Sequence, residues 1–421
     1  MSTENNNRIP RLRFPGFSGE WEVRTLGSIA SKINRRNSRL EVTRVLTNSA
    51  NSGIVDQSKY FDRDIAVKDN TANYHIVELE DFVYNPRIST AAPVGPISIN
   101  KIGRGIMSPL YTVFKIHTGC IAFFEHYFQT NIWHPYLKSI ANYGARFDRM
   151  NISTDGFFNM PILIPSLAEQ KKIAKCLTGI DNLIAAQSDN VDALKEKKKG
   201  LMQQLFPQDG ETTPRLRFPG FEGEWEEKKL GDVGSFIRGL SYNNSEVTQD
   251  SSSTLVIRSN NIIPDSIVDY KNGLVFVTKA PSEEQVLRKG DVVICLANGS
   301  SNLVGKSSSF NGDYSGIITV GAFCGIYRSE LPICRYLIQT TTYKEKINII
   351  KQGGDGSLAN LYGKDILELA FYFPSQEEQN KIVECLSALD DQIAAETEKL
   401  EALKKHKRGL MQQLFPQPDN K

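Results

Sequence analysis

The chain has 421 residues, and its hydrophobic content of 40% is ordinary for a protein that folds into two or three domains. Six cysteines occur without a C-x-x-C pair, so the sequence indicates neither a zinc ribbon nor a disulfide framework. A formal net charge of +2 is too small to predict a nucleic-acid-binding protein from composition, so charge has to be compared region by region.

The polarity of the N-terminal end and the lengths of the apolar runs predict where the protein works. Residues 1–7 are polar and are not followed by the apolar stretch of a signal peptide. No apolar run approaches the roughly 20 residues that span a bilayer. We therefore expect a cytoplasmic protein that does not enter a membrane.

A short phrase opens the chain and is later repeated. PRLRFPGFSGEWE at 10–22 returns as PRLRFPGFEGEWE at 214–226, with Ser18 changed to Glu222. We expect its aromatic side chains to pack where each domain meets a long helix, and burial in an ordinary core is the alternative explanation. These side chains are Phe14, Phe17, Trp21, Phe218, Phe221 and Trp225.

Two segments, 23–164 and 227–373, follow the phrases and align with each other only in patches. Both show strand-like runs with turn signals rather than helical periodicity. DFVYNPRISTAAPVGPISIN at 81–100 has the layout of DVVICLANGSSNLVGKSSSF at 291–310, so we expect two homologous α/β domains. The first segment has 16 Lys and Arg against 11 Asp and Glu, whereas the second has 15 of each, so only the first domain is basic.

The longest repeat follows each segment, at 165–208 and 374–417, and 25 of its 44 positions are identical. Apolar residues recur at alternating steps of four and three, which is the pattern of a coiled-coil seam, and prolines lie at both ends. About 39 helical residues make a rod of nearly 60 Å. The seam residues are Ile173, Leu177, Ile180, Ile184, Val191, Leu194, Leu201, Leu205, Ile382, Leu386, Leu389, Ile393, Leu400, Leu403, Leu410 and Leu414.

Each long helix needs a partner for its apolar stripe, and the obvious partner is its own copy. The sequence predicts an α/β (α+β) chain: two globular α/β domains joined by two long helices that pair as an antiparallel intramolecular coiled coil, with a pseudo-twofold repeat. Packing of each helix on its own domain or on another protein is the alternative. Polar residues interrupt the seam at Gln187, Lys198, Glu396 and Lys407, and we expect them to fix its register.

The sequence contains no complete catalytic motif. GSSNLVGKSS at 299–308 resembles a phosphate-binding loop, but the required spacing puts glycine where Ser300 stands. YNPR at 84–87 lacks the second proline and the aromatic residue with which amino-methyltransferases hold a base. Histidines of the first domain have no metal-ligand spacing, and the second domain has no histidine. We therefore expect binding rather than catalysis, and no metal.

The loops of both domains carry side chains that suit duplex DNA. Arginine reads guanine and asparagine reads adenine, and two heads on a rod reach half-sites about 10 to 10.5 bp apart. A solvated loop or a turn explains any one of these residues, so the prediction rests on their joint placement. The candidates in the first domain are Asn34, Arg35, Arg36, Asn37, Arg39, Arg87, Ser89, Thr90, Tyr143, Arg146 and Arg149. Those in the second are Arg238, Tyr242, Asn243, Asn244, Arg258, Asn260, Asn261, Asn298, Ser300, Ser301, Asn302, Lys306, Lys351 and Asn360.

The repeated RLRFPGF-x-GEWE, the helix starts LAEQKKIAKCL and QEEQNKIVECL, and GLMQQLFPQ twice give the chain a family resemblance. It resembles the DNA-specificity subunit of a bacterial type I restriction-modification system over nearly its whole length. The resemblance implies two target-recognition domains, each reading one half of a split, asymmetric sequence. The expected divisions are 1–22 (phrase packing near the C-terminus), 23–164 (first target-recognition domain), 165–208 (central helix), 209–226 (repeat phrase and connector), 227–373 (second target-recognition domain) and 374–421 (C-terminal helix).

The resemblance also implies partners for this chain. Two modification subunits, which bind S-adenosylmethionine and methylate adenine, are expected to dock on it, and motor-nuclease restriction subunits, which use ATP and Mg, to join them. The chain itself is then a non-catalytic, DNA-binding subunit without a cofactor. Two other classes remain open: a two-headed protein-interaction scaffold, which predicts no DNA retention, and a nucleotide enzyme, which predicts loss of activity on Lys306→Ala.

Overall fold

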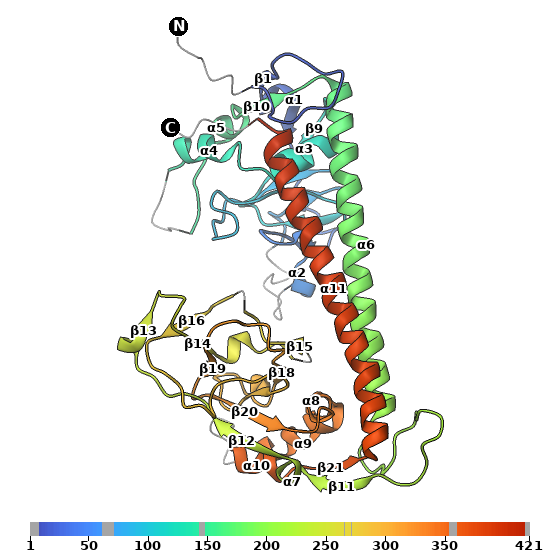
Figure 1. The fold of residues 1–421 in the computed structure, drawn as a ribbon. Coiled ribbons are helices and arrows are strands. Elements are labelled where there is room, and N and C mark those ends of the chain that lie inside the picture. Colours follow the sequence, from blue (N-terminus) through green and yellow to red (C-terminus); the bar gives the residue numbers. More distant parts are fainter. Residues whose placement is uncertain are drawn as a thin grey trace. The chain divides into compact units, whose positions relative to one another are not determined.

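The structure is a computed structural model, and it describes residues 8–60, 71–142, 148–264, 266–270, 272–352 and 360–416. The chain divides into two compact units (Figure 1). Unit 1 comprises residues 1–189 and 398–421, and unit 2 comprises residues 190–397. The divisions fall inside the two long helices, so each helix contributes one half to each unit.

The two long helices are α6 (Leu167–Leu205) and α11 (Gln376–Leu414), with 39 residues each. Both begin with the same cap, because the Glu169 N–H donates to Ser166 Oγ and the Glu378 N–H donates to Ser375 Oγ, each at 3.3 Å. All sixteen predicted seam residues are buried or half-buried. No helix in the described part of the chain is long and apolar enough to cross a membrane.

The two helices run antiparallel. In unit 1, Asp181 in the first half of α6 pairs with Lys407 near the end of α11 at 2.6 Å. In unit 2, Lys198 near the end of α6 pairs with Asp390 in the first half of α11, also at 2.6 Å. The antiparallel coiled coil predicted from the sequence is therefore confirmed, and the lysines that interrupt its apolar seam have carboxylate partners.

Unit 1 combines short strands with helices around one main sheet, of strand order β2-β9-β6-β7, and the pairs β1-β10, β3-β4 and β5-β8. All of these strands pair antiparallel. The elements are β1 (Glu22–Thr25), α1 (Leu26–Ile29), β2 (Ala30–Lys32), β3 (Leu46–Ser49), β4 (Gly53–Asp56), α2 (Gln57–Tyr60), β5 (His75–Val77), β6 (Phe82–Tyr84), β7 (Ile97–Ile99), β8 (Gly105–Met107), β9 (Thr112–Ile116), α3 (Ile121–Phe128), α4 (His134–Ile140), α5 (Thr154–Phe158) and β10 (Pro161–Ile164).

Unit 2 has a five-stranded sheet, β12-β20-β17-β18-β15, a four-stranded sheet, β13-β16-β14-β19, and the pair β11-β21. The pairs β14-β19 and β15-β18 are parallel. The elements are β11 (Glu226–Lys229), α7 (Leu230–Val233), β12 (Gly234–Arg238), the 3-10 turn Asn244–Glu246, β13 (Val247–Thr248), β14 (Thr254–Ile257), the 3-10 turn Ser259–Asn261, β15 (Ser266–Ile267), β16 (Val275–Val277), β17 (Val292–Cys295), the 3-10 turn Ser301–Leu303, β18 (Ser307–Ser309), β19 (Ile318–Val320), β20 (Cys324–Ser329), α8 (Cys334–Leu337), α9 (Thr341–Gln352), α10 (Gly363–Leu367) and β21 (Ala370–Phe373).

The central strands of the two units pair in the same register. In unit 1, Phe82 of β6 lies opposite Phe114 of β9. In unit 2, Val292 of β17 lies opposite Tyr327 of β20. Strand β6 is therefore equivalent to β17, and β9 to β20, as the alignment of 81–100 with 291–310 predicts. The expectation of two homologous α/β domains is confirmed.

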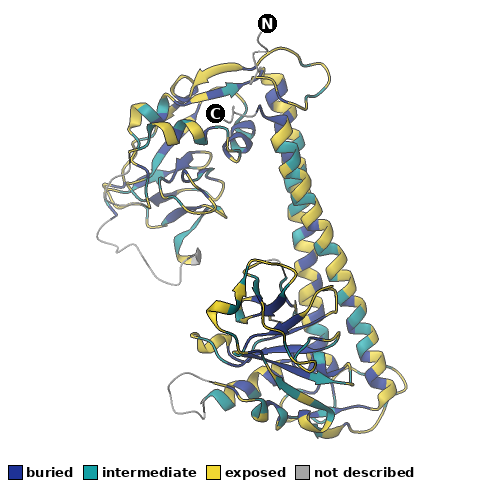
Figure 2. Cartoon of the chain, turned by 60° about the vertical axis from the view of Figure 1, so that its left-hand side comes forward, coloured by how far each residue is buried: buried dark blue, intermediate teal, exposed yellow. Residues whose placement is uncertain are grey.

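The core of each unit reaches from its sheets to its halves of the long helices, and Figure 2 shows the buried residues gathered there. The repeated phrase closes each core at the same point. Trp21 lies 6.0 Å from the ring of Phe415, and Trp225 lies 6.4 Å from the ring of Phe206. Each phrase thus packs against the end of one long helix and leads into the first strand of the domain that follows it.

Candidate nucleic-acid interface

The basic loop, which follows β2 and carries the candidates from Asn34 to Arg39, is held in place by ion pairs and a backbone contact. Arg35 pairs with Asp81 and, at 4.0 Å, with Glu78. Burial raises the pKa of the Asp81 carboxyl, and Arg35 opposes that shift. The Arg36 guanidinium donates to the Asn73 carbonyl. These contacts fix the loop while leaving 43% of the Arg35 side chain exposed to solvent.

Arg39 lies at the outer end of the same loop. Its side chain is 86% exposed and lies 3.7 Å from Glu41, which is itself 57% exposed, so this ion pair holds the side chain only weakly. Asn34 is also exposed. Arg39 is therefore the arginine of this loop best placed to reach a phosphate.

Two of the predicted DNA-contacting asparagines are buried instead. Asn37 is 1% exposed, and its side chain donates to the Val42 carbonyl at 2.9 Å and accepts from the Val42 N–H at 3.1 Å. Asn261 is fully buried, and it donates to the Asn272 carbonyl at 2.8 Å and accepts from the Arg258 N–H at 3.1 Å. Both amides shape their own loops, so in this structure they present no edge to a base.

A second group in unit 1 brings together residues 86–90 and 148–151. Arg87 and Arg149 form an antiparallel bridge, and Arg87 Nε lies 3.4 Å from a carboxylate oxygen of Asp148. Arg87 is exposed and Arg149 half-buried. The remaining candidates of this group are exposed: Ser89 and Thr90. The candidates Tyr143 and Arg146 lie outside the described residues.

In unit 2 the turn 321–324 between β19 and β20 connects the candidate loops. Gly321 forms a parallel bridge with Leu240, and its N–H donates to the Ile257 carbonyl at 2.9 Å. The Leu296 N–H donates to the Phe323 carbonyl at 2.8 Å. Loops 238–244, 258–261 and 296–302 therefore meet around one turn.

Further contacts tie the polar side chains of these loops to one another. The Asn298 amide donates to Ser259 Oγ at 2.9 Å, and the Arg258 guanidinium donates to the Gly273 carbonyl at 3.2 Å. The exposed candidates are Arg238, Asn243, Asn244, Arg258, Asn260, Ser300, Ser301, Asn302 and Asn360, and the half-buried ones are Tyr242, Asn298, Lys306 and Lys351. Lys351 Nζ donates to the Val304 carbonyl at 3.4 Å, so the end of α9 also borders this group.

The loop around Lys306 is not a phosphate-binding loop. Such a loop places its lysine at the start of a helix, but Lys306 is followed by strand β18, and its carbonyl accepts from the Cys295 N–H at 3.0 Å. This geometry argues against the nucleotide-enzyme alternative that the sequence left open.

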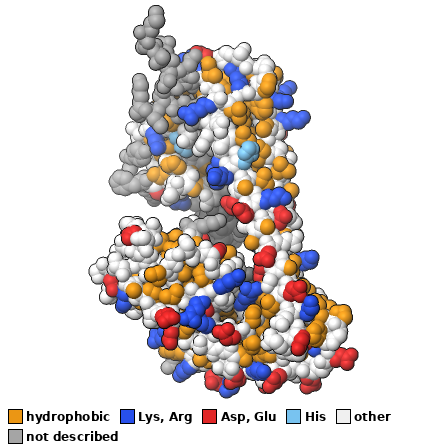
Figure 3. All heavy atoms as spheres, viewed as in Figure 1, with side chains coloured by type: hydrophobic (Ala, Val, Ile, Leu, Met, Phe, Trp, Pro, Cys, Tyr) orange, Lys and Arg blue, Asp and Glu red, His pale blue; other side chains and the backbone are white. Residues whose placement is uncertain are grey.

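The candidate interfaces of unit 1 and unit 2 differ in charge. On the face of unit 2 seen in Figure 3, Lys and Arg side chains lie among Asp and Glu side chains. The most deeply placed pair is Arg328 with Asp291, at 2.7 Å and with the carboxylate 2% exposed, and it supports the strand that leads to the loops. Unit 2 therefore offers hydrogen-bonding groups without a strong basic field, whereas the loops of unit 1 add an excess of arginine.

Three histidines of unit 1 are buried or half-buried and help to pack its core. Burial lowers the pKa of His75 to about 4, with Arg36 adding to the effect, and lowers the pKa of His134 to about 4. Burial also lowers the pKa of His126, whose Nε2 lies 3.1 Å from Thr178 Oγ1. These histidines are neutral near pH 7. Among the described residues, no three His, Cys, Asp or Glu side chains are grouped to hold a metal ion.

A second surface recurs in both units where the phrase meets the start of a long helix. Arg13 pairs with Glu169 and Arg217 pairs with Glu378, each at 2.7 Å and with the carboxylate 2% exposed. Sequence reasoning missed these pairs, because each arginine lies more than 150 residues from its glutamate, and only the repetition of both residues in the two copies signals them.

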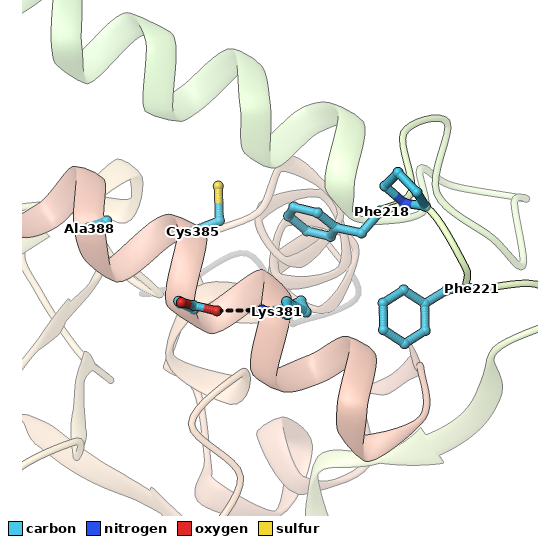
Figure 4. A pocket seen from close by; sticks show the side chains of 7 residues that line it. Phe218, Phe221, Lys381, Cys385 and Ala388 are labelled. Atoms are coloured by element: carbon cyan, nitrogen blue, oxygen red, sulfur yellow. Dashed lines mark hydrogen bonds and ion pairs between the residues drawn. The ribbon is translucent and has the colours of Figure 1, made fainter.

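In unit 2 this surface is hollowed. A pocket of about 500 Å³ lies between the phrase and α11, and Figure 4 shows Phe218 and Phe221 of the phrase beside Cys385 and Lys381 of the helix. In unit 1 a pocket of about 580 Å³ also borders the phrase and the start of α6. Gly16 and Gly220, with φ of +90° and +92°, give the two phrases the same turn.

Many exposed residues of this second surface are the same in both copies, although Ser18 and Glu222 differ. Burial explains identical core residues, but it does not explain identical side chains that face solvent. On the phrase and the helix segments that it contacts, the exposed identical pairs include Arg11 and Arg215, Leu12 and Leu216, Pro15 and Pro219, Glu20 and Glu224, Glu22 and Glu226, Lys172 and Lys381, Gln203 and Gln412, and Gln204 and Gln413. Three further exposed identical pairs, Ala185 and Ala394, Ala186 and Ala395, and Ala193 and Ala402, lie farther along the long helices.

Comparison with protein families gives one match that covers most of the chain. The family described as "Type I restriction modification DNA specificity domain" matches residues 18–195 and again residues 222–405. Each match includes one phrase end, one variable segment and most of one long helix. The repeat found in the sequence is thus a repeat of this family's domain.

Curated relatives carry related names. The putative type I restriction enzyme MjaX specificity subunit of Methanocaldococcus jannaschii is 24% identical over 439 residues, which cover 94% of this chain and 93% of the relative. The MjaVIII specificity subunit of the same organism is 26% identical over 278 residues, or 62% of each chain, so the match spans less than two thirds of that relative. The EcoKI specificity subunit of Escherichia coli (strain K12) is 28% identical over 176 residues, which cover 40% of this chain and 37% of the relative.

Solved structures share the fold at low sequence identity. The type I restriction-modification S subunit from M. genitalium is 14% identical, with a TM-score of 0.56 over 97% of this chain and 100% of that one. A chain from the structural study of complex assembly and conformational transition of the type I R-M system is 17% identical, with a TM-score of 0.50 over 96% and 99%.

Proposed function

This chain belongs to the type I restriction-modification DNA specificity family, and we propose that each of its two units reads one half of a split DNA sequence and so directs methylation or cleavage by partner subunits. The observation that carries the proposal is the pairing of a common scaffold with different loops. Strand β6 pairs with β9 in unit 1 in the same register as β17 pairs with β20 in unit 2. The loops that these strands support nevertheless carry different polar side chains. Different loops on equal scaffolds suit two different half-sites.

The partners follow from the second surface. Exposed side chains that are identical in both copies face the same kind of protein twice, so two copies of one partner bind, one in each unit. We assign these to two modification subunits, which bind S-adenosylmethionine and methylate adenine, and we expect restriction subunits, which use ATP and Mg, to join the complex. The chain itself supplies recognition and no catalytic group.

The two interfaces contribute differently to binding. The excess of basic residues in segment 23–164 supplies phosphate contacts, which raise affinity for any sequence. Unit 2 relies on hydrogen-bonding groups, such as Asn260 and Asn298, and its phosphate contacts come in part from the modification subunits. This division accounts for a sequence-specific DNA-binding protein whose net charge is only +2.

Adenine-methylation sequencing tests the proposal. DNA is taken from cells that carry this chain with its modification subunits and from cells that carry those subunits alone. We expect a split motif that is methylated only when this chain is present, and we expect exchange of segment 23–164 for that of another family member to change one half of it. An assembled complex that methylates no motif would contradict the proposal and favour the protein-interaction scaffold.

The duplicated docking surface has its own test. Phe17→Lys and Phe221→Lys each place a charge in one copy of the surface, so each variant should retain one modification subunit and the double variant none. Native mass spectrometry of the co-expressed complex reads the stoichiometry. Retention of two subunits by the double variant would place the docking surface elsewhere.

A further inference from the structure

One short turn in unit 1 ends in an exposed apolar side chain. The turn 108–111 joins β8 to β9, and the Tyr111 N–H donates to the Ser108 carbonyl at 3.1 Å. Pro109 fills the second position of this turn, where its fixed φ is favourable. Leu110 in the third position is 54% exposed.

Unit 2 has the same turn. Residues 321–324 join β19 to β20, and the Cys324 N–H donates to the Gly321 carbonyl at 2.8 Å. Phe323 in the third position is 72% exposed, the highest value among the exposed large hydrophobic side chains of the described residues.

Strand register proves that the two positions correspond. Phe114 of β9 and Tyr327 of β20 lie opposite equivalent residues of the neighbouring strands β6 and β17. Leu110 precedes Phe114 by four residues, and Phe323 precedes Tyr327 by four. A single exposed apolar side chain is ordinary in a folded protein. An exposed apolar side chain that recurs at the same turn position in two diverged domains is not ordinary, because nothing in the scaffold requires an apolar residue there.

Both turns lie among the candidate DNA-binding loops. In unit 1 the Pro109 carbonyl accepts a hydrogen bond from His75, and His75 forms a bridge with Arg36 of the basic loop. In unit 2 the Phe323 carbonyl accepts from the Leu296 and Ala297 N–H groups, at 2.8 and 3.2 Å. Each turn is therefore joined to a segment that carries candidate DNA-binding residues, the basic loop in unit 1 and loop 296–302 in unit 2.

We infer that Leu110 and Phe323 are the apolar base-contacting residues of the two interfaces, each packing on the C5 methyl group of a thymine in its own half-site. The inference rests on the proposed function and adds two specificity-determining residues to it. Leucine and phenylalanine differ in size and shape, as expected if the two half-sites place their thymines differently.

The choice of thymine follows from the chemistry of the major groove. The edges of base pairs there present hydrogen-bond donors and acceptors, and the one apolar group is the thymine methyl. The surrounding Arg, Asn and Ser side chains serve the donors and acceptors. A leucine or phenylalanine side chain has no partner there except that methyl group.

Deoxyuridine tests the contact directly, because it differs from thymidine only by the missing methyl group. The probe is a duplex that carries the motif found by methylation sequencing, with thymine or uracil in one half-site. Since the partner methylates adenine, each half-site contains at least one A·T pair. The assembled complex of this chain with its modification subunits should bind the uracil half-site about fourfold more weakly, as expected for one buried methyl.

Phe323→Ala should bind the thymine duplex about fourfold more weakly and should no longer distinguish thymine from uracil in the half read by unit 2. Its discrimination in the other half should stay intact. Leu110→Ala should show the reverse pattern. Leu183→Ala, on α6 and 57% exposed, is the matched control and should leave both half-sites unchanged.

The inference is overturned if Phe323→Ala weakens binding equally to thymine and uracil duplexes, which would indicate a wedge between base pairs rather than a methyl contact. It is also overturned if the unaltered complex does not distinguish the two bases in either half-site. Failure of the proposed function looks different, because the complex then shows no preference for the motif at all.

Discussion

Units 1 and 2 share a scaffold and the surface between phrase and helix but differ in charge, histidine content and loops. The arginine-to-glutamate pair that joins phrase to helix has the same geometry in both, 2.7 Å with the carboxylate 2% exposed. By contrast, the variable segment of unit 1 has 16 basic against 11 acidic residues, and that of unit 2 has 15 of each. The comparison separates what a repeated protein must keep from what it is free to change.

Differences in the sheets follow the same division. The register of the central strands is kept, but unit 1 surrounds its four-stranded sheet with two-stranded pairs, whereas unit 2 builds sheets of five and four strands. Some candidate loops follow the strands beside the central ones, such as the loop after β2 and residues 258–261 after β14, and others follow the central strands β6 and β17. Their rearrangement changes the surface around the candidate DNA-binding loops, while the cores that reach the long helices are kept.

The largest expected difference between the units lies in how the phrase packs. Phe415 has three aromatic rings within 6.1 Å, and Phe206, its counterpart, lies 6.4 Å from Trp225. Phe415→Ala should destabilise unit 1 by about 4 kcal/mol and Phe206→Ala should destabilise unit 2 by about 3 kcal/mol, because Phe415 loses more aromatic contacts. Urea unfolding followed by tryptophan fluorescence, with Trp225 reporting on unit 2, measures both.

Equal or reversed losses in the two variants would contradict this difference. The tryptophans Trp21 and Trp133 report on unit 1, so the signals separate when Trp225 is changed to Phe.

The buried ion pairs should respond equally in the two units. Arg13→Met leaves Glu169 unpaired, and Arg217→Met leaves Glu378 unpaired, so each variant should lose about 3 kcal/mol in its own unit. Arg11→Met, at an exposed position of the same phrase, is the control and should change little. The same unfolding assay reads all three, and a loss confined to one unit would show that the repeat is not energetically equivalent.

Acid should weaken unit 1 more than unit 2. All five histidines lie in unit 1, and burial lowers the pKa of His75 to about 4 from an ordinary value of 6.5, with Arg36 and Lys32 adding to the shift. The folded state keeps this histidine neutral while the unfolded state binds a proton below pH 6.5. The stability is therefore complete above pH 6.5 and is lost as pH falls toward 4, by about 1 kcal/mol at pH 5.5.

Unfolding of unit 1 and unit 2 at pH 7.5 and pH 5.5 checks the sign and the size of this effect. A His75→Gln variant should reduce the response of unit 1 between these values by about 1 kcal/mol, and the part that remains reports on His134 and His126, whose pKa burial also lowers. An acid response of unit 2 as large as that of unit 1 would show that carboxylates rather than histidines dominate.

The smallest expected effect concerns phosphate contact. Arg39→Ala removes an 86% exposed cation from the basic loop of unit 1. Binding of the assembled complex should weaken a few-fold for every sequence, the slope of affinity against salt should fall by about one, and the motif should not change. Titrations at several salt concentrations measure the slope. A changed motif with an unchanged slope would make Arg39 a base-reading residue.

The long helices and the repeat were predictable because their signals are local or duplicated. Seam periodicity, the Ser-x-x-Glu starts and flanking prolines need only neighbouring residues. They predict helices that start within two residues of α6 and α11 and that enclose both helices in the expected segments 165–208 and 374–421. The layout of 81–100 and 291–310 likewise leads to the observed register of the central strands.

The candidate interface was less accessible to sequence reasoning. Asn37 lies next to two exposed arginines in the chain, yet it is buried because its amide closes the loop onto Val42, and composition does not reveal that choice. Phe323 was missed for the opposite reason, since an apolar residue near a strand predicts core. Aligning the turns before β9 and β20 would have paired it with Leu110.

The most direct test of the central claim is adenine-methylation sequencing with a chain in which segment 227–373 is replaced by a second copy of segment 23–164. If each unit reads one half of the target independently, the methylated motif should contain the half read by unit 1 twice, in inverted orientation. A motif that keeps the half assigned to unit 2, in a complex that assembles with its modification subunits, would contradict the account.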